Sequence, residues 1–252
     1  MAVTMEQARQ WRARFEEESP EAVLRWALSE VHPDIALASS FSMEDIVLIA
    51  MMADIRSDAR IFALDTGRLH EETYEAAEAV RRKLGVRIEW YFPSMAAVEE
   101  LERNKGLHSF RESLENRHEC CRIRKAEPLS RALSGLRAWV TGQRREQAVT
   151  RRSLEVVEID ETHGGILKLN PLAGWTEGEV REYVRKRRLP VNRLHDMGYP
   201  SIGCAPCTQP VVPGEDPRAG RWWWERPEHK ECGLHAGNAG GTVFRREGER
   251  KE

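Results

Sequence analysis

Short apolar runs alternate with longer amphipathic stretches along most of the chain. Four of the runs predict buried strands, at residues 35–39, 60–64, 86–92 and 137–140. The intervening spacing of apolar positions predicts helices at 43–54, 70–84, 94–106 and 122–133. Strands that alternate with helices are typical of a parallel sheet with helices on both faces, so we expect an α/β fold.

Both ends of this alternating region carry further signals. Capping residues predict two N-terminal helices, at 5–18 and 20–30, and a later helix ending near residue 186. Residues 154–160 and 166–170 look like a small hairpin around two glycines, and beyond Pro190 the chain reads as irregular. We expect N-terminal helices in residues 1–30, an α/β domain in 31–212 and a C-terminal segment in 213–252.

Composition limits the class of protein. Apolar residues make up 40% and charged residues 32% of the 252 residues, with a net charge of -2, which is typical of a globular chain. The apolar runs are far shorter than the roughly 20 residues that span a bilayer, and the N-terminus lacks the apolar core of a signal peptide. We therefore expect a cytoplasmic protein, without membrane attachment and without broad nucleic-acid binding.

The cysteines form the first chemical signal. Cys120 and Cys121 are adjacent, Cys204 and Cys207 form a CxxC pair, and Cys232 stands alone near the C-terminus. Two close thiol pairs that folding brings together suit zinc or an iron–sulfur centre. Adjacent cysteines favour a cluster, whose corners are separate irons, over one zinc ion. Scattered core cysteines remain the simplest alternative.

Polar loops follow three of the predicted strands. In open parallel sheets, ligands bind beyond the carboxyl ends of the strands. Ser39, Ser40 and Ser42 follow the first strand and precede a helix, where hydroxyls and free amides suit an anion. Residues 141–152 follow the fourth strand and carry Gly142 and four arginines, which indicates an oxyanion pocket. Helix capping and a solvated charged face are the alternatives.

Several motifs together are similar to one known family. The motifs are SSFSMED, LDTGRLHEETY, CCRIRKAEPL, TGQRREQAVTR, LHDMGYPSIGCAPCT, RAGRWWW and KECGLH, in this order. Between about residues 35 and 235, this order resembles the assimilatory sulfonucleotide reductases, within the PP-loop adenine nucleotide α-hydrolase-like folds. The resemblance implies that fold, a parallel α/β sheet, followed here by an irregular C-terminal tail.

The resemblance also implies roles for individual residues. Members with both cysteine pairs bind a [4Fe-4S] cluster and generally reduce adenosine 5′-phosphosulfate in sulfate assimilation, toward cysteine biosynthesis. By this resemblance Cys120, Cys121, Cys204 and Cys207 are cluster ligands and Cys232 is the nucleophile. Lys125 would offset charge in the transition state. The substrate-binding candidates are Ser39, Ser40, Ser42, Gly142, Arg144, Arg218, Arg221 and His235.

Counting thiols constrains the reaction that the resemblance implies. If four cysteines hold iron, Cys232 is the only thiol left in the chain, so it has no internal resolving partner. Attack of its thiolate on the sulfate sulfur would form an S-sulfocysteine and release AMP. An external dithiol would then free sulfite. In the family this donor is thioredoxin or a glutaredoxin-like protein.

Other functions stay open at this point. Reduction of the 3′-phosphorylated substrate is one alternative. A PP-loop ATP pyrophosphatase or RNA thiolase is another, although Phe41 and Ser42 stand where ATP-using relatives carry glycine, which weakens that interpretation. A zinc-stapled nucleic-acid-binding module is the non-enzymatic alternative. The sequence leaves the oligomeric state open, including a homo-oligomer.

Overall fold

A computed structural model describes residues 4–226 of the 252-residue chain. The predictions for Cys232 and His235 therefore lie outside the described residues. Within this part, six strands form one sheet in the order β3-β2-β1-β4-β6-β5. Their bounds are β1 (Ile35–Ser39), β2 (Arg60–Leu64), β3 (Ile88–Tyr91), β4 (Ala138–Val140), β5 (Val157–Asp160) and β6 (Ile166–Leu169).

The strand directions create a ligand-binding position in the middle of the sheet. All neighbouring strands run parallel except β5, which pairs antiparallel to β6. From β1 the chain moves outward through β2 and β3, and then returns to place β4 on the other side of β1. Reversal of strand order at β1 and β4 opens a crevice at their carboxyl ends.

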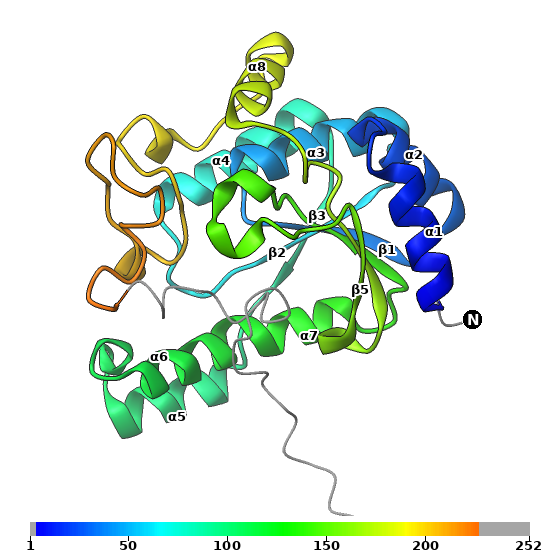
Figure 1. Cartoon of the computed structure of the whole chain (residues 1–252). Helices are drawn as coiled ribbons and strands as arrows, with labels where there is room; N and C mark the ends of the chain where they lie inside the picture. Colours follow the sequence, from blue (N-terminus) through cyan, green and yellow to red (C-terminus); the bar gives the residue numbers. More distant parts are fainter. Residues whose placement is uncertain (1–3, 227–252) are drawn as a thin grey trace, which may run out of the picture.

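Helices cover both faces of this sheet (Figure 1). The eight α-helices of the described part are α1 (Met5–Phe15), α2 (Pro20–Glu30), α3 (Met43–Ile55), α4 (Glu71–Leu84), α5 (Met95–Lys105), α6 (Leu114–Cys121), α7 (Glu127–Leu133) and α8 (Glu177–Arg187). In Figure 1, α5, α6 and α7 lie on one side of the sheet, and α2, α3 and α4 lie on the other. The predicted α/β class is confirmed.

Two apolar cores correspond to the two faces. The larger core contains α3, whose residues from Ile46 to Met52 are fully buried between the sheet and the helices α2, α4 and α8. A helix that is apolar on all sides is expected only in such a central position. The smaller core packs α7 residues such as Leu129 and Leu133 against Phe62 and Trp139 of the sheet.

Side-chain caps set several of the helix ends. The capping boxes that begin α1, between Thr4 and Gln7, and α8, between Thr176 and Glu179, are both present. Ser19 caps α2, as its position before a proline predicts. No helix in residues 4–226 is long and apolar enough to cross a membrane.

Two predicted elements differ from the structure. The predicted hairpin forms as β5 and β6, but β6 also pairs in parallel with β4, so the hairpin extends the central sheet instead of standing apart. The predicted helix at 122–133 is interrupted: a π-helical turn at Arg122–Ala126 joins α6 to α7. Such π turns are frequent at functional sites, and this one directly follows Cys121.

Candidate functional site

A cavity of about 500 Å³ opens at the carboxyl ends of β1, β2 and β4. This volume lies within the range of small-molecule sites, about 300–1,000 Å³. It brings together all the predicted substrate-binding residues that the structure describes, with Lys125 and Cys204 beside them. The predicted residues in its wall are Ser39, Ser40, Ser42, Lys125, Gly142, Arg144, Cys204, Arg218 and Arg221.

The loop after β1 is held by its own side chains. Phe41 adopts φ +58, a left-handed conformation that costs a non-glycine residue roughly 1–2 kcal/mol. Its ring is buried and lies 5.7 Å from the ring of Trp90, and this packing offsets the strain. The amide of Phe41 donates to Ser39 Oγ at 3.1 Å, and Ser42 caps α3. A phenylalanine thus occupies a turn whose left-handed backbone usually favours glycine.

A buried carboxylate sits where this loop would receive an anion. Ser40 donates from both its backbone amide and its hydroxyl to Asp45 Oδ2, at 2.7 and 2.8 Å. Asp45 itself is buried, and desolvation raises the pKa of its carboxyl from 3.8 to about 6 despite these hydrogen bonds. The donors of Ser40 are therefore already engaged by an internal acid.

This buried acid should give the protein a pH-dependent stability. Between about pH 3.8 and 6 the folded chain holds a proton on Asp45 that the unfolded chain releases, so this group favours folding as the pH falls. We expect the free energy of unfolding of the wild type, relative to Asp45→Asn, to rise by about 1 kcal/mol from pH 7 to pH 5. Urea unfolding of both proteins at each pH measures the difference. Parallel pH profiles would contradict the assignment.

The loop after β4 closes against the same acids. A Cβ on Gly142 would lie 2.4 Å from Asp45 Oδ1 and 2.9 Å from Glu44 Cβ, so only glycine fits this approach. Arg144 is buried, and its guanidinium pairs with Glu44 and with Glu146, each at 2.9 Å. Gly142 and Arg144 therefore join the β1 and β4 loops into one wall of the cavity.

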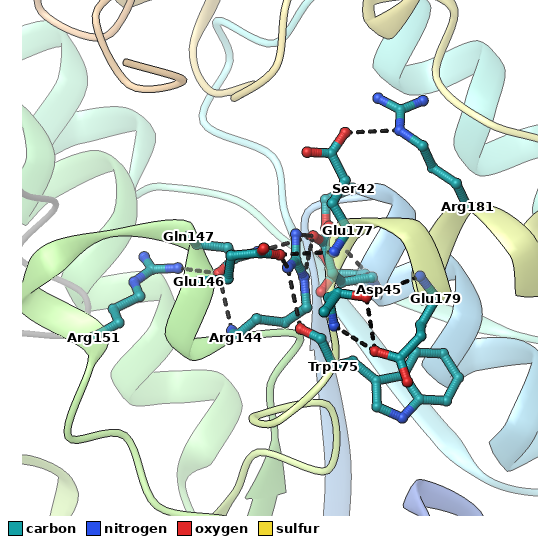
Figure 2. Close-up of polar contacts among 12 residues, drawn as sticks. Ser42, Asp45, Arg144, Glu146, Gln147, Arg151, Trp175, Glu177, Glu179 and Arg181 are labelled. Atoms are coloured by element: carbon teal, nitrogen blue, oxygen red, sulfur yellow. Dashed lines mark hydrogen bonds and ion pairs between the residues drawn. The ribbon is translucent and has the colours of Figure 1, made fainter.

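Figure 2 shows how this wall continues toward α8. Arg144 contacts Glu146, and Gln147 contacts Arg151. Glu146 also accepts from the amide of Glu177 at the start of α8, at 2.8 Å. Acidic side chains neutralise arginines in this wall. Their ion pairs hold the charged side chains in place around the cavity.

The loop after β2 contacts both of the segments that carry the cysteine pairs. Cys120 and Cys121 end α6, and Cys204 and Cys207 flank a short turn far along the chain. The thiol of Cys204 donates to Thr66 Oγ1 at 3.3 Å, and the amide of Ala205 donates to Arg68 O at 2.8 Å. Arg124, just after the first pair, donates to Thr66 O at 2.8 Å. Residues 66–68 therefore contact both segments that carry the predicted ligand pairs.

The thiols share an electrostatic environment. Burial raises the pKa of the Cys120 thiol, and it raises that of Cys207 to about 12. The pKa of Cys207 is raised further by Cys204 and less by Cys120, whereas the positive charge of Lys125 lowers the pKa of both Cys120 and Cys207. Three of the predicted ligands and Lys125 are thus close enough to interact.

The four cysteines offer thiol donors of the kind that bind zinc and iron–sulfur centres. All four thiols are free of disulfides, and two come from each of two converging segments. Among residues 4–226, no three thiol, imidazole or carboxylate groups gather closely enough to hold one metal ion. Four thiolates are the ligand set both of a [4Fe-4S] cluster and of a structural zinc site, so the chemistry of these donors fits a metal centre of either kind.

The arginines of the RAGRWWW motif form another part of the cavity wall. Arg221 lies 4.6 Å from the ring centroid of Trp222 and donates to Ile202 O at 3.3 Å. Gly203 allows this approach, since a Cβ there would lie 2.3 Å from Arg221 Nη2. Arg218 lies 6.0 Å from the Trp222 ring. Trp222 is buried, as core packing would require, while Trp223 is 38% exposed.

Sequence reasoning missed several residues in this site. Asp45, Thr66 and His195 all line the cavity, and burial lowers the pKa of His195. Glu102 accepts from both Arg68 and Arg124, which braces the loop beside the cysteines. The signal that could have indicated Arg124 was its place in the chain, two residues after Arg122 and directly beyond the first cysteine pair.

The comparisons with known proteins agree with this geometry. The model of the phosphoadenosine phosphosulfate reductase domain matches residues 34–210, more than half of the chain. A relative from Allochromatium vinosum named adenosine 5′-phosphosulfate reductase is 53% identical over 201 residues, covering 80% of this chain and 78% of the relative.

Solved structures give the same fold. A phosphoadenylyl-sulfate reductase from Candida auris, in a phosphate complex, aligns with a TM-score of 0.72 at 28% identity, covering 84% of this chain and 99% of that one. An FMN adenylyltransferase from Candida glabrata aligns with a TM-score of 0.53 at 12% identity, covering 92% and 80%, and so shows the fold alone. The predicted PP-loop type of α/β fold is confirmed.

Proposed function

The chain belongs to the phosphoadenosine phosphosulfate reductase family and is an oxidoreductase, and on this premise we propose that it reduces adenosine 5′-phosphosulfate to sulfite and AMP. The observation that carries the proposal is the cavity, which is lined by the loops after β1 and β4 together with Lys125 and Cys204. Relatives at 53% and 51% identity carry the name of that reductase, which supports the same substrate here.

The proposed first step is a transfer of the sulfo group to Cys232. The thiolate attacks the sulfate sulfur, a sulfur–sulfur bond forms, and the bond from sulfur to the phosphate oxygen breaks. AMP leaves with the electron pair of that bond. Since the substrate and the thiolate are both negative, positive charge at the reacting group must offset their repulsion. Lys125, Arg218 and Arg221 in the cavity wall supply it.

The proposed second step releases sulfite with two electrons from a dithiol. One thiolate of reduced thioredoxin, or of a glutaredoxin-like protein, attacks Cys232 Sγ and expels sulfite, forming a mixed disulfide. The second thiol of the donor then attacks the mixed disulfide, which restores Cys232 and leaves the donor oxidised. The chain needs this external donor because its other four cysteines are assigned to the metal site.

We also propose that Cys120, Cys121, Cys204 and Cys207 hold a [4Fe-4S] cluster. The cluster would order the two converging segments and set the local charge beside Lys125. The contacts of residues 66–68 with both cysteine-bearing segments support this assignment, because they hold both segments against one loop.

Metal analysis should separate this cluster from zinc. Protein purified without oxygen should contain about four irons and four sulfides per chain. Cys204→Ser should lose most of the iron, whereas the matched control Cys232→Ser should keep it, because residue 232 is not an assigned ligand. Stoichiometric zinc with no sulfide would contradict the proposal.

An assay of three nucleotides tests the function itself. With reduced thioredoxin, sulfite should form from adenosine 5′-phosphosulfate at a higher kcat/KM than from its 3′-phosphorylated form. A preference for the 3′-phosphorylated form would identify the chain as the other kind of reductase in this family. Pyrophosphate release from ATP, without sulfite from either sulfonucleotide, would instead favour a PP-loop pyrophosphatase.

A further inference from the structure

Two arginine side chains lie over the ring of Trp222. The guanidinium carbon of Arg221 is 4.6 Å from the centroid of this ring, and that of Arg117 is 4.7 Å from it. Trp222 is only 1% exposed, so both contacts are shielded from water. A cation is attracted by the negative potential of a tryptophan face, and the attraction is stronger where water is excluded. The ring therefore holds two cations at once.

The charge of one of these arginines is balanced inside the protein. Arg117 Nε lies 2.6 Å from Glu225 Oε1, and the two side chains are 1% and 9% exposed. A buried charge requires such a partner, because its loss of hydration is costly. Glu225 also reduces the repulsion between the two arginines, so both can lie close to one ring. Since Arg117 belongs to α6, this arrangement fastens the ring of Trp222 to a helix of the fold.

The backbone of Trp222 explains how the side chains of two consecutive residues come into contact. Arg221 pairs with Thr208 in an isolated antiparallel bridge. Along an extended chain, consecutive side chains point to opposite sides. Trp222 instead has φ +41, a left-handed conformation that breaks this alternation. A bulky residue keeps such a conformation only where its surroundings impose it, and such positions are frequent at functional sites.

Arg221 connects the ring to the cavity. Its side chain lines the cavity, whereas Trp222 is not part of the described wall. Nη1 of Arg221 donates to Ile202 O at 3.3 Å and to Ser201 Oγ at 3.4 Å. These two oxygens and the ring are neutral groups, so they orient the guanidinium without cancelling its charge.

We infer that Trp222 is a positioning residue, whose ring holds the guanidinium of Arg221 toward the sulfo group of the bound sulfonucleotide. The inference rests on the proposed function, in which Arg221 offsets negative charge at that group. Trp222 acts through Arg221, because it does not itself line the described cavity. It therefore contributes to the affinity for adenosine 5′-phosphosulfate and much less to that for AMP, which lacks the sulfo group.

Binding in a Cys232→Ser background tests this inference, because the sulfonucleotide is then not consumed during the measurement. Trp222→Leu keeps an apolar side chain at this position but removes the aromatic face. We expect it to weaken binding of adenosine 5′-phosphosulfate at least about fivefold, the scale of a buried contact between a cation and an aromatic ring. Binding of AMP should change less than about twofold. Trp222→Phe, which keeps an aromatic face, should recover part of the loss. Calorimetry gives both affinities.

A double-mutant cycle shows whether Trp222 acts through Arg221. Arg221→Ala alone should also weaken binding of the sulfonucleotide selectively. Adding Trp222→Leu to Arg221→Ala should cause little further selective loss, because the contact that it removes is already gone. Losses that simply add would overturn the inference, because they would show that the two residues act independently.

Trp26→Leu is the matched control for removal of a tryptophan ring. Trp26 packs against Trp11 and Phe15, with ring centroids 5.0 and 4.7 Å away, outside the described wall of the cavity. This variant should lower Tm and leave both nucleotide affinities unchanged. An equal loss of both nucleotides in Trp222→Leu, or no loss of either, would overturn the inference.

A tetrafluorinated tryptophan at position 222 alone keeps the test decisive if Trp222→Leu does not fold. Fluorination preserves the shape of the ring and withdraws the negative potential from its face. Selective weakening of adenosine 5′-phosphosulfate binding is then expected, and an unchanged ratio of the two affinities would overturn the inference. If the Cys232→Ser background binds neither nucleotide, the proposed function is refuted and the inference falls with it.

Discussion

Cys232→Ser is expected to lower the rate of sulfite formation at least a thousandfold, which corresponds to about 4 kcal/mol of transition-state stabilisation. A serine hydroxyl is protonated at neutral pH and is a far weaker nucleophile toward sulfur than a thiolate. No other cysteine can replace it if the remaining four hold the cluster. The measurement is sulfite release from adenosine 5′-phosphosulfate with reduced thioredoxin.

Two controls make this result specific to the nucleophile. The Cys232→Ser protein should bind AMP as tightly as the wild type, because AMP lacks the sulfo group that the Cys232 thiolate attacks. Its iron and sulfide content should also match the wild type. Sulfite release at the wild-type rate would show that Cys232 does not receive the sulfo group.

Lys125→Ala is expected to lower the rate of adduct formation at least tenfold, about 1.4 kcal/mol. Lys125 lines the cavity beside Cys204, and its charge acts on the thiols of Cys120 and Cys207. Its removal leaves the negative charge that develops during sulfo transfer less well stabilised. Single-turnover kinetics with saturating substrate measure the step without contributions from thioredoxin.

A nearby lysine provides the control for this prediction. Lys105 ends α5, pairs with Glu119 at 2.6 Å and is 42% exposed, outside the cavity wall. Lys105→Ala removes one positive charge close to α6 and should leave the rate unchanged. Lys125→Arg should recover part of the lost rate, because it restores the charge with a different shape. A wild-type rate in Lys125→Ala would remove Lys125 from the reaction.

Elements with strong local signals could be predicted from the sequence. The strands at 35–39 and 60–64 match the structure at both ends, because each is an apolar run bounded by polar residues. The caps at Thr4 and Thr176 were also predictable, since a capping box needs only residues three positions apart. These features depend on neighbours in the chain.

Features that depend on distant residues could not be predicted in this way. The pairing of β6 with β4 is set by tertiary packing, and nothing in residues 166–169 indicates a parallel partner. The spacing of apolar residues after Cys121 predicts a regular helix. It does not distinguish that helix from the π turn that forms there. The pairing of Ser40 with Asp45 changes the meaning of the serine motif, because those donors hold an internal carboxylate.

The same distinction applies to the candidate site: some of its features could be predicted from the sequence, and others depend on contacts between distant residues. The loops after β1 and β4 were expected at the ligand-binding edge because each follows a predicted strand of a parallel sheet, and the structure confirms that they meet at one cavity. The role of residues 66–68 as the joint between both cysteine-bearing segments requires contacts across more than 130 residues, such as Thr66 with Cys204. The assigned cluster ligands and the assigned nucleophile stay predictions that chemistry must test.

Mass analysis of Cys232 after one turnover tests the central claim most directly. The wild type, mixed with adenosine 5′-phosphosulfate in the absence of any dithiol, should gain one sulfo group on the peptide that contains Cys232 and release one equivalent of AMP. Reduced thioredoxin should then remove the group as sulfite. An unmodified Cys232 alongside released AMP, or a sulfo group on another residue, would contradict the account.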